Sequence, residues 1–330
     1  MITIRKTHPT HIGRHRCYTC LCFLAILAGM VCFQGCGKSP LAESPRQREN
    51  FDFGWRFRLG EVENATAADF DDSAWRDVLL PHDWSIEGEY DEKNPTSWRG
   101  AYLPAGIGWY RKTFLLHPSD AGKRLFLEFD GVYMNSDVYL NGHHLGHRPN
   151  GYISFQYEIT EHVNTNGPNV VAVRVDNSKV PSGRWYTGCG IYRHTWLTKT
   201  NSIHVAHNGT YVRTEKVSDS ESRVFIEVEL VNQSEQSTEV EVSHTIQDKS
   251  DRSAGTFSMS AKLAASETRT ESASIPVSDP QLWSSDHPHL YKLVTTVRQA
   301  GVLVDRYETP FGIRYLEFGP EYGMKLNGER

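Results

Sequence analysis

Short runs of hydrophobic residues, divided by turn-forming residues, characterise the chain from residue 51 onward. Residues 124–130 alternate in part between apolar and polar side chains, which is typical of a half-buried strand. Residues 136–140 run into Asn141-Gly142, the strongest short-range signal of a β-hairpin, and 142–146 resume as the partner strand. This pattern predicts antiparallel strands joined by tight turns.

A longer β-branched run at 169–176 is typical of a strand that is buried on both sides or lies in the core of a sandwich. Among the early segments, only residues 71–75 have the character of a helical turn. Short strands at close spacing, with Gly, Pro and Asn between them, predict a β-sandwich or jelly roll for residues 51–200.

The composition shifts near residues 198–202, after which Trp becomes scarce and Ser, Thr, Glu and Val become frequent. Segments whose alternation or β-branching predicts strands are 222–230, 239–246, 290–297 and 303–307. Residues 253–270 are instead polar and rich in Ala and Ser. Roughly seven strands in about 110 residues, without a Cys pair, predict an immunoglobulin-like sandwich that lacks the disulfide over residues 201–313. The fold class is therefore all-β, with two sandwiches in tandem.

Residues 314–330 begin a further element. Leu326-Asn327-Gly328 has the composition of a hairpin turn, yet only one arm of the hairpin is recognisable in the sequence. We therefore interpret the chain as a fragment.

The first 36 residues have the composition of a targeting segment. Basic residues precede an apolar run at 21–33, which is too short to span a bilayer with ease, and Gly35-Cys36 follows. This pattern resembles a bacterial lipoprotein signal in which Cys36 is lipidated, although a plain secretory peptide or a short uncleaved anchor remain alternatives. Residues 37–50 are polar and are expected to form a linker. We expect an exported protein of a bacterial cell envelope, periplasmic or attached to the membrane by lipid.

The net charge and the cysteine content argue against several classes of function. The net charge of −5, without a basic stripe in the body of the chain, argues against a nucleic-acid partner. Five of the six cysteines lie in the first 36 residues, so the body has only Cys189 and no internal disulfide. A single cysteine without a recognisable base nearby is best interpreted as a packing residue. We predict no cofactor.

The stretch 182–196 is the strongest candidate for a binding site. It contains four aromatic residues, two arginines and three glycines within fifteen residues. Glycine permits close backbone approach, while aromatic faces and guanidinium groups are what proteins place against sugar rings and carboxylates. This composition indicates the rim of a binding site.

Other candidate chemistry is weaker. Asp83 and Glu87 form a short-range carboxylate pair, but turn and capping hydrogen bonds made by Asp83 and His82 explain the pattern better. His143, His144 and His147 follow one hairpin arm, where His143 and His144 point to opposite faces, so solvated side chains are favoured over metal ligands. We predict no metal site.

An ordered series of short motifs over residues 51–330 gives the chain a family resemblance. The motifs are Phe53-Gly-Trp-Arg-Phe57, Leu80-Pro-His-Asp-Trp-Ser-Ile-Glu-Gly88, Gly108-Trp-Tyr-Arg-Lys-Thr-Phe114, Val138-Tyr-Leu-Asn-Gly142, Arg184-Trp-Tyr-Thr-Gly188, Gly190-Ile-Tyr-Arg193, Pro280-Gln-Leu-Trp283, Phe311-Gly-Ile-Arg314 and Leu326-Asn-Gly328. In this order they resemble the N-terminal half of a family 2 glycoside hydrolase, the group of β-galactosidases, β-glucuronidases and β-mannosidases.

The resemblance implies a galactose-binding-like jelly roll, an immunoglobulin-like domain and then an eight-fold β/α barrel that holds both catalytic glutamates. The barrel is missing from this chain apart from its lead-in at 314–330, so no catalytic residue can be assigned and the chain is expected to be inactive alone. Retaining hydrolysis of β-glycosides, and of β-galactosides in particular, is the implied activity of the whole enzyme, with carbohydrate and the catalytic barrel as partners.

In this architecture the 182–196 loop reaches the mouth of the active site. Arg184, Trp185 and Tyr186 are therefore implied to contact substrate, Arg193 to hold the loop, and Trp98 and Arg99 to reach the same rim. Better-known members have a carboxylate near the position of Arg184, which leaves the sugar preference open. Two alternatives remain: these residues form an inter-domain packing surface, or the chain is a stand-alone exported carbohydrate-binding or scaffolding protein.

Overall fold

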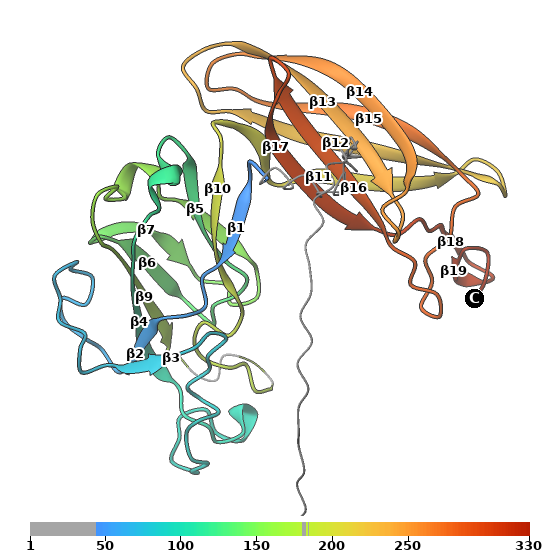
Figure 1. Cartoon of the computed structure of the whole chain (residues 1–330). Coiled ribbons are helices and arrows are strands. Elements are labelled where there is room, and N and C mark those ends of the chain that lie inside the picture. The colour runs from blue at the N-terminus through green and yellow to red at the C-terminus, as the bar shows by residue number, and fades with distance from the viewer. Residues whose placement is uncertain (1–43, 180–182, 184) are drawn as a thin grey trace, which may run out of the picture. The chain divides into compact units, whose positions relative to one another are not determined.

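The computed structural model describes residues 44–179, 183 and 185–330, which form two β-sandwiches followed by a hairpin (Figure 1). The expected signal segment, including Cys36, lies outside the described residues, as does Arg184. Within the described ranges no helix is long and apolar enough to cross a membrane. The predicted all-β fold class is confirmed for this part of the chain.

The first sandwich consists of two antiparallel sheets. The six-stranded sheet has the order β3 (Arg76–Val78), β2 (Trp55–Leu59), β4 (Gly106–Phe114), β9 (Asn169–Asn177), β6 (Ser136–Leu140) and β7 (His143–Arg148). The four-stranded sheet has the order β1 (Gln47–Asn50), β10 (Thr195–Thr200), β5 (Arg124–Phe129) and β8 (Phe155–Glu158). Three short 3-10 helices lie in the connections: η1 (Trp98–Gly100), η2 (Pro118–Asp120) and η3 (Thr160–His162).

The core of this sandwich explains why β9 lacks alternation. Its Val171, Val173 and Val175 join the main core cluster, in which Trp55 and Leu127 are fully buried. Ala172, on the opposite face, packs in a second cluster with Trp75 and Trp109. Because both faces of the central strand are covered, its sequence from Val170 to Val175 is apolar except at Arg174, as the β-branched run predicts.

Two details of the first sandwich differ from the sequence-based expectations. Residues 71–75, expected to form a helical turn, form a plain turn that places Asp72 against Arg56 and Arg111. Residues 47–50, expected in the linker, form β1, which pairs with β10 from Gln47 opposite Lys199 to Asn50 opposite Trp196. The side chains of β1 are mostly exposed, so its hydrophobic pattern gives no sign of a strand.

The second sandwich has seven long strands. One sheet has the order β11 (Ile203–Lys216), β12 (Glu221–Asn232) and β15 (Thr268–Ser278). The other has the order β14 (Ser253–Leu263), β13 (Thr238–Gln247), β16 (Tyr291–Gln299) and β17 (Val302–Phe311). Strand β12 alternates as predicted and buries Val224, Ile226, Val228 and Leu230. The polar stretch 253–270 supplies β14 and the start of β15, whose side chains are largely exposed.

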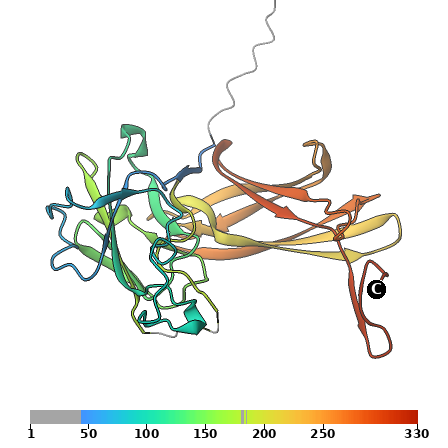
Figure 2. The same cartoon turned by 90° about the horizontal axis from the view of Figure 1, so that it is seen from below.

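The C-terminal residues form a hairpin that the sequence analysis did not predict, and the predicted turn at residues 326–328 follows its second strand. Strands β18 (Leu316–Gly319) and β19 (Gly323–Leu326) pair with each other, and Figure 2 shows this hairpin in red beside the end of the chain. Asn327 and Gly328 have φ angles of 54° and 87°, and a bridge joins Leu326 to Glu329, so the predicted turn is present. The Asn327 side chain accepts from the Tyr315 amide and donates to the Trp283 carbonyl, both at 3.0 Å. The hairpin is thus anchored to the second sandwich.

Candidate functional site

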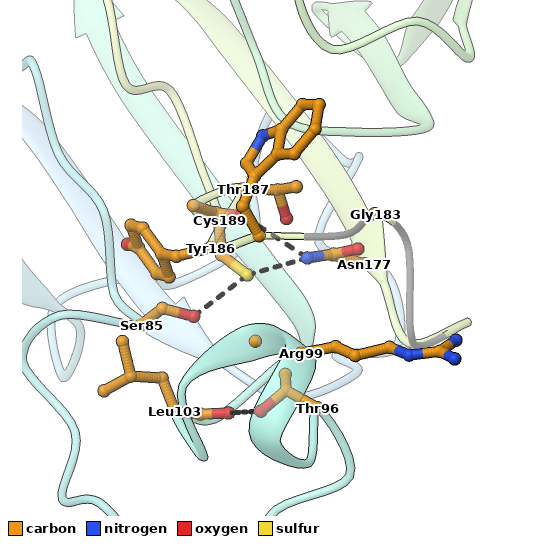
Figure 3. A pocket seen from close by; sticks show the side chains of 12 residues that line it. Ser85, Thr96, Arg99, Leu103, Asn177, Gly183, Tyr186, Thr187 and Cys189 are labelled. Atoms are coloured by element: carbon orange, nitrogen blue, oxygen red, sulfur yellow. Dashed lines mark hydrogen bonds between the residues drawn. The ribbon is translucent and has the colours of Figure 1, made fainter.

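A narrow pocket in the first sandwich brings together the two segments that the sequence analysis singled out (Figure 3). It is a small cavity of about 20 Å³ whose mouth is open to solvent. Residues 96–103, which contain η1, form one wall, residues 185–189 form another, and Ser85 and Asn177 lie between them. The predicted residues Arg99, Trp185 and Tyr186 all line this pocket.

Trp98, another predicted rim residue, does not line the pocket. Trp98 is on η1 beside the pocket, 68% exposed, and its ring lies under the Arg99 guanidinium at 5.3 Å from the ring centroid. Trp185 is 65% exposed, so two tryptophans flank the pocket with most of their ring surface accessible. Arg184 lies outside the described residues. Large exposed aromatic side chains beside a pocket are typical of surfaces that stack on sugars or on a partner.

Asp83 holds the wall formed by residues 185–189. One carboxylate oxygen accepts from the Cys189 amide at 2.8 Å and from the Ser85 amide at 3.0 Å, and the other accepts from the Tyr186 hydroxyl. Burial, followed by the neighbouring Asp83 carboxylate, raises the pKa of Tyr186, so its hydroxyl stays protonated and donates. The bonds from Tyr186 and Cys189 fix the loop to the segment that follows Pro81, and the bond from Ser85 shapes that segment itself.

Backbone pairing reinforces this attachment. The His82 amide donates to the Ile191 carbonyl and the Trp84 amide to the Cys189 carbonyl, at 2.8 and 3.2 Å. Gly190 has a φ angle of 118° and lies so close to His82 that a Cβ there would meet the His82 carbonyl at 2.8 Å. Glycine at this position is therefore required by both conformation and space.

Cys189 is a packing residue, as predicted. Its side chain is 1% exposed, and its sulfur contacts the Ser85 hydroxyl at 3.1 Å and the Asn177 amide nitrogen at 3.0 Å. Burial raises the pKa of the Cys189 thiol, which disfavours the thiolate that a nucleophile needs.

Asn177 is a pocket residue that the sequence analysis did not single out. It is the last residue of β9 and is 3% exposed, and its amide nitrogen also donates to the Gly188 carbonyl at 3.3 Å. Because a carbonyl can only accept, this bond fixes the orientation of the amide. The Asn177 Oδ1 then has no protein partner, which is uncommon for a buried polar atom. Nothing in the sequence around Asn177 distinguishes it from an ordinary strand end.

The carboxylates considered in the sequence analysis do not form a catalytic pair. Asp83 is occupied by its three donors, whereas Glu87 is bound to Arg76 and lies 3.3 Å from His82. Arg76 lowers the pKa of Glu87, and burial lowers the pKa of His82. These contacts hold residues 82–87 in place beside Arg76.

Arg193 and the histidines of the β6–β7 hairpin are also outside the pocket. Arg193 is exposed, and the hydrogen bonds described above that anchor the loop come to Asp83, so a holding role for Arg193 stays a prediction. His144 and His147 both contact Asp137, and His143 stacks on His162 at 3.7 Å between ring centroids. Among the described residues no group of three or more His, Cys, Asp or Glu side chains is arranged to hold a metal ion.

Two family models match the chain in sequence. The model described as "Glycosyl hydrolase 2 galactose-binding domain-like" matches residues 104–218, and the model described as "Glycosyl hydrolases family 2" matches residues 203–314. Together the two models span most of both sandwiches.

Curated proteins and solved structures agree with these models. The chain is 44% identical over 295 residues to "Beta-galactosidase BoGH2A" of Bacteroides ovatus, a match that covers 89% of this chain and 34% of that protein. A "Putative beta-glucuronidase" of Formosa agariphila is 36% identical over 287 residues, covering 87% of this chain and 27% of that protein. The crystal structure of a family 2 glycosyl hydrolase from Bacteroides cellulosilyticus has a TM-score of 0.83 at 35% identity, covering 86% of this chain and 37% of that one. The chain therefore spans about a third of the length of these relatives.

Proposed function

Because the chain belongs to glycosyl hydrolase family 2, we propose that it forms the β-domain part of an enzyme that hydrolyses terminal β-glycosides, and β-galactosides in particular. The relative with 44% identity is named a beta-galactosidase, and two further relatives are named beta-glucuronidases. The β-glycoside class is common to these names. The preference for galactose rests on the higher identity to the first.

The catalytic step is proposed to require sequence beyond this chain. A retaining glycosidase needs two carboxylates about 5–5.5 Å apart, one as nucleophile and one as acid and base. Among the described residues that line the pocket, the only charged side chain is Arg99. We expect the two carboxylates in the portion of the relatives that this chain does not match, and we expect the chain to be inactive alone.

The pocket walls are proposed to contact the substrate at the mouth of the active site. The convergence of Trp185, Tyr186 and Arg99 in one pocket supports this role, since the two segments are separate in sequence. Contacts to parts of the substrate that do not react stabilise the bound and transition states equally, so they lower KM more than they raise kcat.

A fusion enzyme tests this proposal. The chain would be joined to the portion of the Bacteroides ovatus relative that it does not match, and hydrolysis of an aryl β-galactoside and of a β-linked galacto-oligosaccharide would be measured. Trp185→Ala is expected to raise KM for the oligosaccharide several-fold with little change in kcat, because removing a rim contact weakens uniform binding. Tyr211→Ala, an exposed aromatic of the second sandwich, is the matched control. An active fusion in which Trp185→Ala leaves both constants unchanged contradicts the rim role.

The second candidate is a stand-alone carbohydrate-binding protein of two β domains. A stand-alone protein needs residues 315–330 to be held without a further domain, and the bond from Asn327 to the Trp283 carbonyl supplies such an anchor. Calorimetry of the chain alone against galactosides and plant oligosaccharides tests this candidate. Binding that Trp185→Ala abolishes supports it, and an absence of binding to a broad glycan panel rejects it.

We also propose that the protein is exported and anchored to the cell envelope through a lipid on Cys36. The basic residues, the apolar run at 21–33 and Gly35-Cys36 support this proposal. Expression in a bacterium with labelled palmitate tests it, because the wild-type chain should incorporate label and Cys36→Ser should not. Label in the Cys36→Ser variant, or none in the wild type, contradicts lipidation.

A further inference from the structure

We infer that one face of the β18–β19 hairpin, formed by Leu316, Phe318, Met324 and Leu326, is the surface on which the catalytic portion of the enzyme docks. This inference rests on the proposed function, in which that portion is the part of the relatives that this chain does not match. Three observations support it: the face is wholly apolar, it is largely exposed, and it lies at the border of the matched family domain.

The pairing register gives the hairpin two unlike faces. The four apolar side chains form two cross-strand pairs, Leu316 with Leu326 and Phe318 with Met324. Paired residues share a face, as does every second residue along a strand, so all four lie together on one face, called the apolar face below. The pair between them, Glu317 with Lys325, lies on the opposite face. The hairpin is therefore amphipathic.

The apolar face has no cover in the described part of the chain. Phe318 is 70% exposed and Met324 is 58% exposed. The opposite face is better packed, because the Lys325 ammonium lies 4.7 Å from the centroid of the Tyr322 ring. A two-stranded hairpin by itself is at best marginally stable in water and needs another element against its apolar side. These side chains thus form a surface that lacks its partner.

Contacts at the base of the hairpin hold this surface in place. Asn327 donates to the Trp283 carbonyl, and the Tyr315 hydroxyl is hydrogen-bonded to the Ser222 hydroxyl of β12. Tyr315 and Asn327 flank the two strands, so these bonds anchor the hairpin and leave its apolar face open. Figure 2 shows the hairpin projecting beyond the second sandwich. A surface that is already held in position costs less to dock against.

The place of the hairpin in the sequence identifies the partner. The family model that covers the second sandwich ends at residue 314, directly before β18. The chain covers 34% of the Bacteroides ovatus relative and 27% of the Formosa agariphila relative, and the part it matches is their N-terminal portion. The hairpin therefore lies where the unmatched portion of the relatives begins.

The small size of the apolar face favours a covalently joined partner over a second copy of the chain. Four side chains can bury only a few hundred Å², whereas a specific interface between separate proteins needs roughly 1,000 Å². A portion joined to the hairpin needs less area, because its effective concentration is on the order of millimolar. The geometry thus suits docking within one polypeptide.

Hydrogen exchange of residues 316–326 measures whether the apolar face is covered. It would be followed by mass spectrometry in the 330-residue chain and in the fusion with the unmatched portion of the Bacteroides ovatus relative. We expect exchange to be at least about tenfold slower in the fusion, the factor that burial of one large apolar side chain supplies. Phe318→Ser and Met324→Ser should each reduce this slowing. Glu317→Ser, on the opposite face of β18, is the matched control and should leave it intact.

The chain alone shows whether these variants act through docking. Because Phe318 and Met324 are exposed there, neither substitution should change its urea unfolding midpoint. Equal exchange in the chain and the fusion, or slowing that survives both substitutions, overturns the inference. Exchange in the chain alone that slows as its concentration rises also overturns it, since a second copy would then cover the face.

Hydrolysis of the aryl β-galactoside by the fusion tests the proposed function separately. An active fusion whose hairpin exchanges as fast as in the chain alone supports the proposed function and rejects the docking surface. A slowly exchanging hairpin in a fusion that hydrolyses no β-glycoside supports the docking surface and rejects the proposed activity.

Discussion

Asp83 and Tyr186 are 103 residues apart in sequence and are joined by a hydrogen bond from the tyrosine hydroxyl to the carboxylate. The same carboxylate accepts from the backbone of Cys189, so one side chain positions both the aromatic and the glycine-flanked part of the pocket wall. Three hydrogen bonds occupy most of the roughly four lone-pair sites of a carboxylate, so Asp83 is committed to holding its neighbours. Asp83 is thus a positioning residue for Trp185 and Tyr186.

Asp83→Asn is expected to lower the free energy of unfolding by about 1–3 kcal/mol. The amide nitrogen replaces one acceptor oxygen, so one of the three donors from Ser85, Tyr186 and Cys189 loses its partner in a half-buried position. Urea unfolding followed by tryptophan fluorescence measures the change. Asp69→Asn, an exposed carboxylate away from the pocket, is the control and should have no effect. Equal unfolding midpoints for Asp83→Asn and the wild type would refute the anchoring role.

Gly190→Ala is expected to lower the free energy of unfolding more than Gly60→Ala does. Gly190 and Gly60 both have a positive φ, at 118° and 98°, but only Gly190 has neighbours close enough to collide with a Cβ. We expect about 1 kcal/mol of destabilisation for Gly60→Ala and about 3 kcal/mol or more for Gly190→Ala. Thermal unfolding of both variants separates the cost of backbone strain from the cost of a collision with the new Cβ. Similar losses of stability in the two variants would mean that the contact with His82 is not tight.

Asn327→Ala is expected to loosen the C-terminal hairpin. The side chain bonds Tyr315 and Trp283, so its loss frees β18 and β19 from the second sandwich. Trypsin should then cleave after Lys325 several-fold faster than in the wild type, as mass spectrometry of the products would show. Asn208→Ala is the matched control, since Asn208 has a similar φ of 53° and an exposed side chain. Unchanged cleavage at Lys325 would show that other contacts hold the hairpin.

The strands that bury side chains were predictable from the sequence, and those that expose them were not. Alternation or β-branching predicts β5, β6, β9, β12 and β13 because each contributes inward-facing residues to a core. Strands β1 and β14 are held mainly by backbone pairing at sheet edges, so their side chains contain little information about their conformation.

The pocket was predictable only in part for a similar reason. Trp185 and Tyr186 were found because the stretch 182–196 concentrates aromatic residues, arginines and glycines, and Arg99 was implied by the family resemblance. Asn177 and Asp83 act through contacts with residues distant in sequence, such as Cys189, and their local sequence is that of an ordinary turn. Whether such a residue is a turn former or a pocket residue depends on which loop the fold brings to it.

The buried His244 predicts a loss of stability on mild acidification. Its ring is fully buried in the second sandwich, one nitrogen contacts the Thr295 hydroxyl at 3.0 Å, and the other has no partner. Burial lowers the pKa of His244 to about 4, from a usual value of 6.5. In the unfolded chain His244 therefore becomes protonated below about pH 6.5, whereas in the folded chain it stays neutral down to about pH 4. Folding stability contributed by this residue is complete above pH 6.5 and is lost as the pH falls through that window.

The expected slope is about 1 kcal/mol per pH unit for His244 between pH 6 and pH 4.5. His204, whose pKa burial also lowers to about 4, contributes a separate slope of the same sign. His244→Gln should remove the part of this slope that comes from His244, as urea unfolding at several pH values would show. This holds whatever the effect of the substitution on stability at pH 7. His287→Gln, an exposed histidine, should leave the slope as in the wild type. If His244→Gln and the wild type lose stability in parallel from pH 6.5 to pH 4, the histidine is protonated in the folded state, and its surroundings must then supply a partner for the second ring nitrogen.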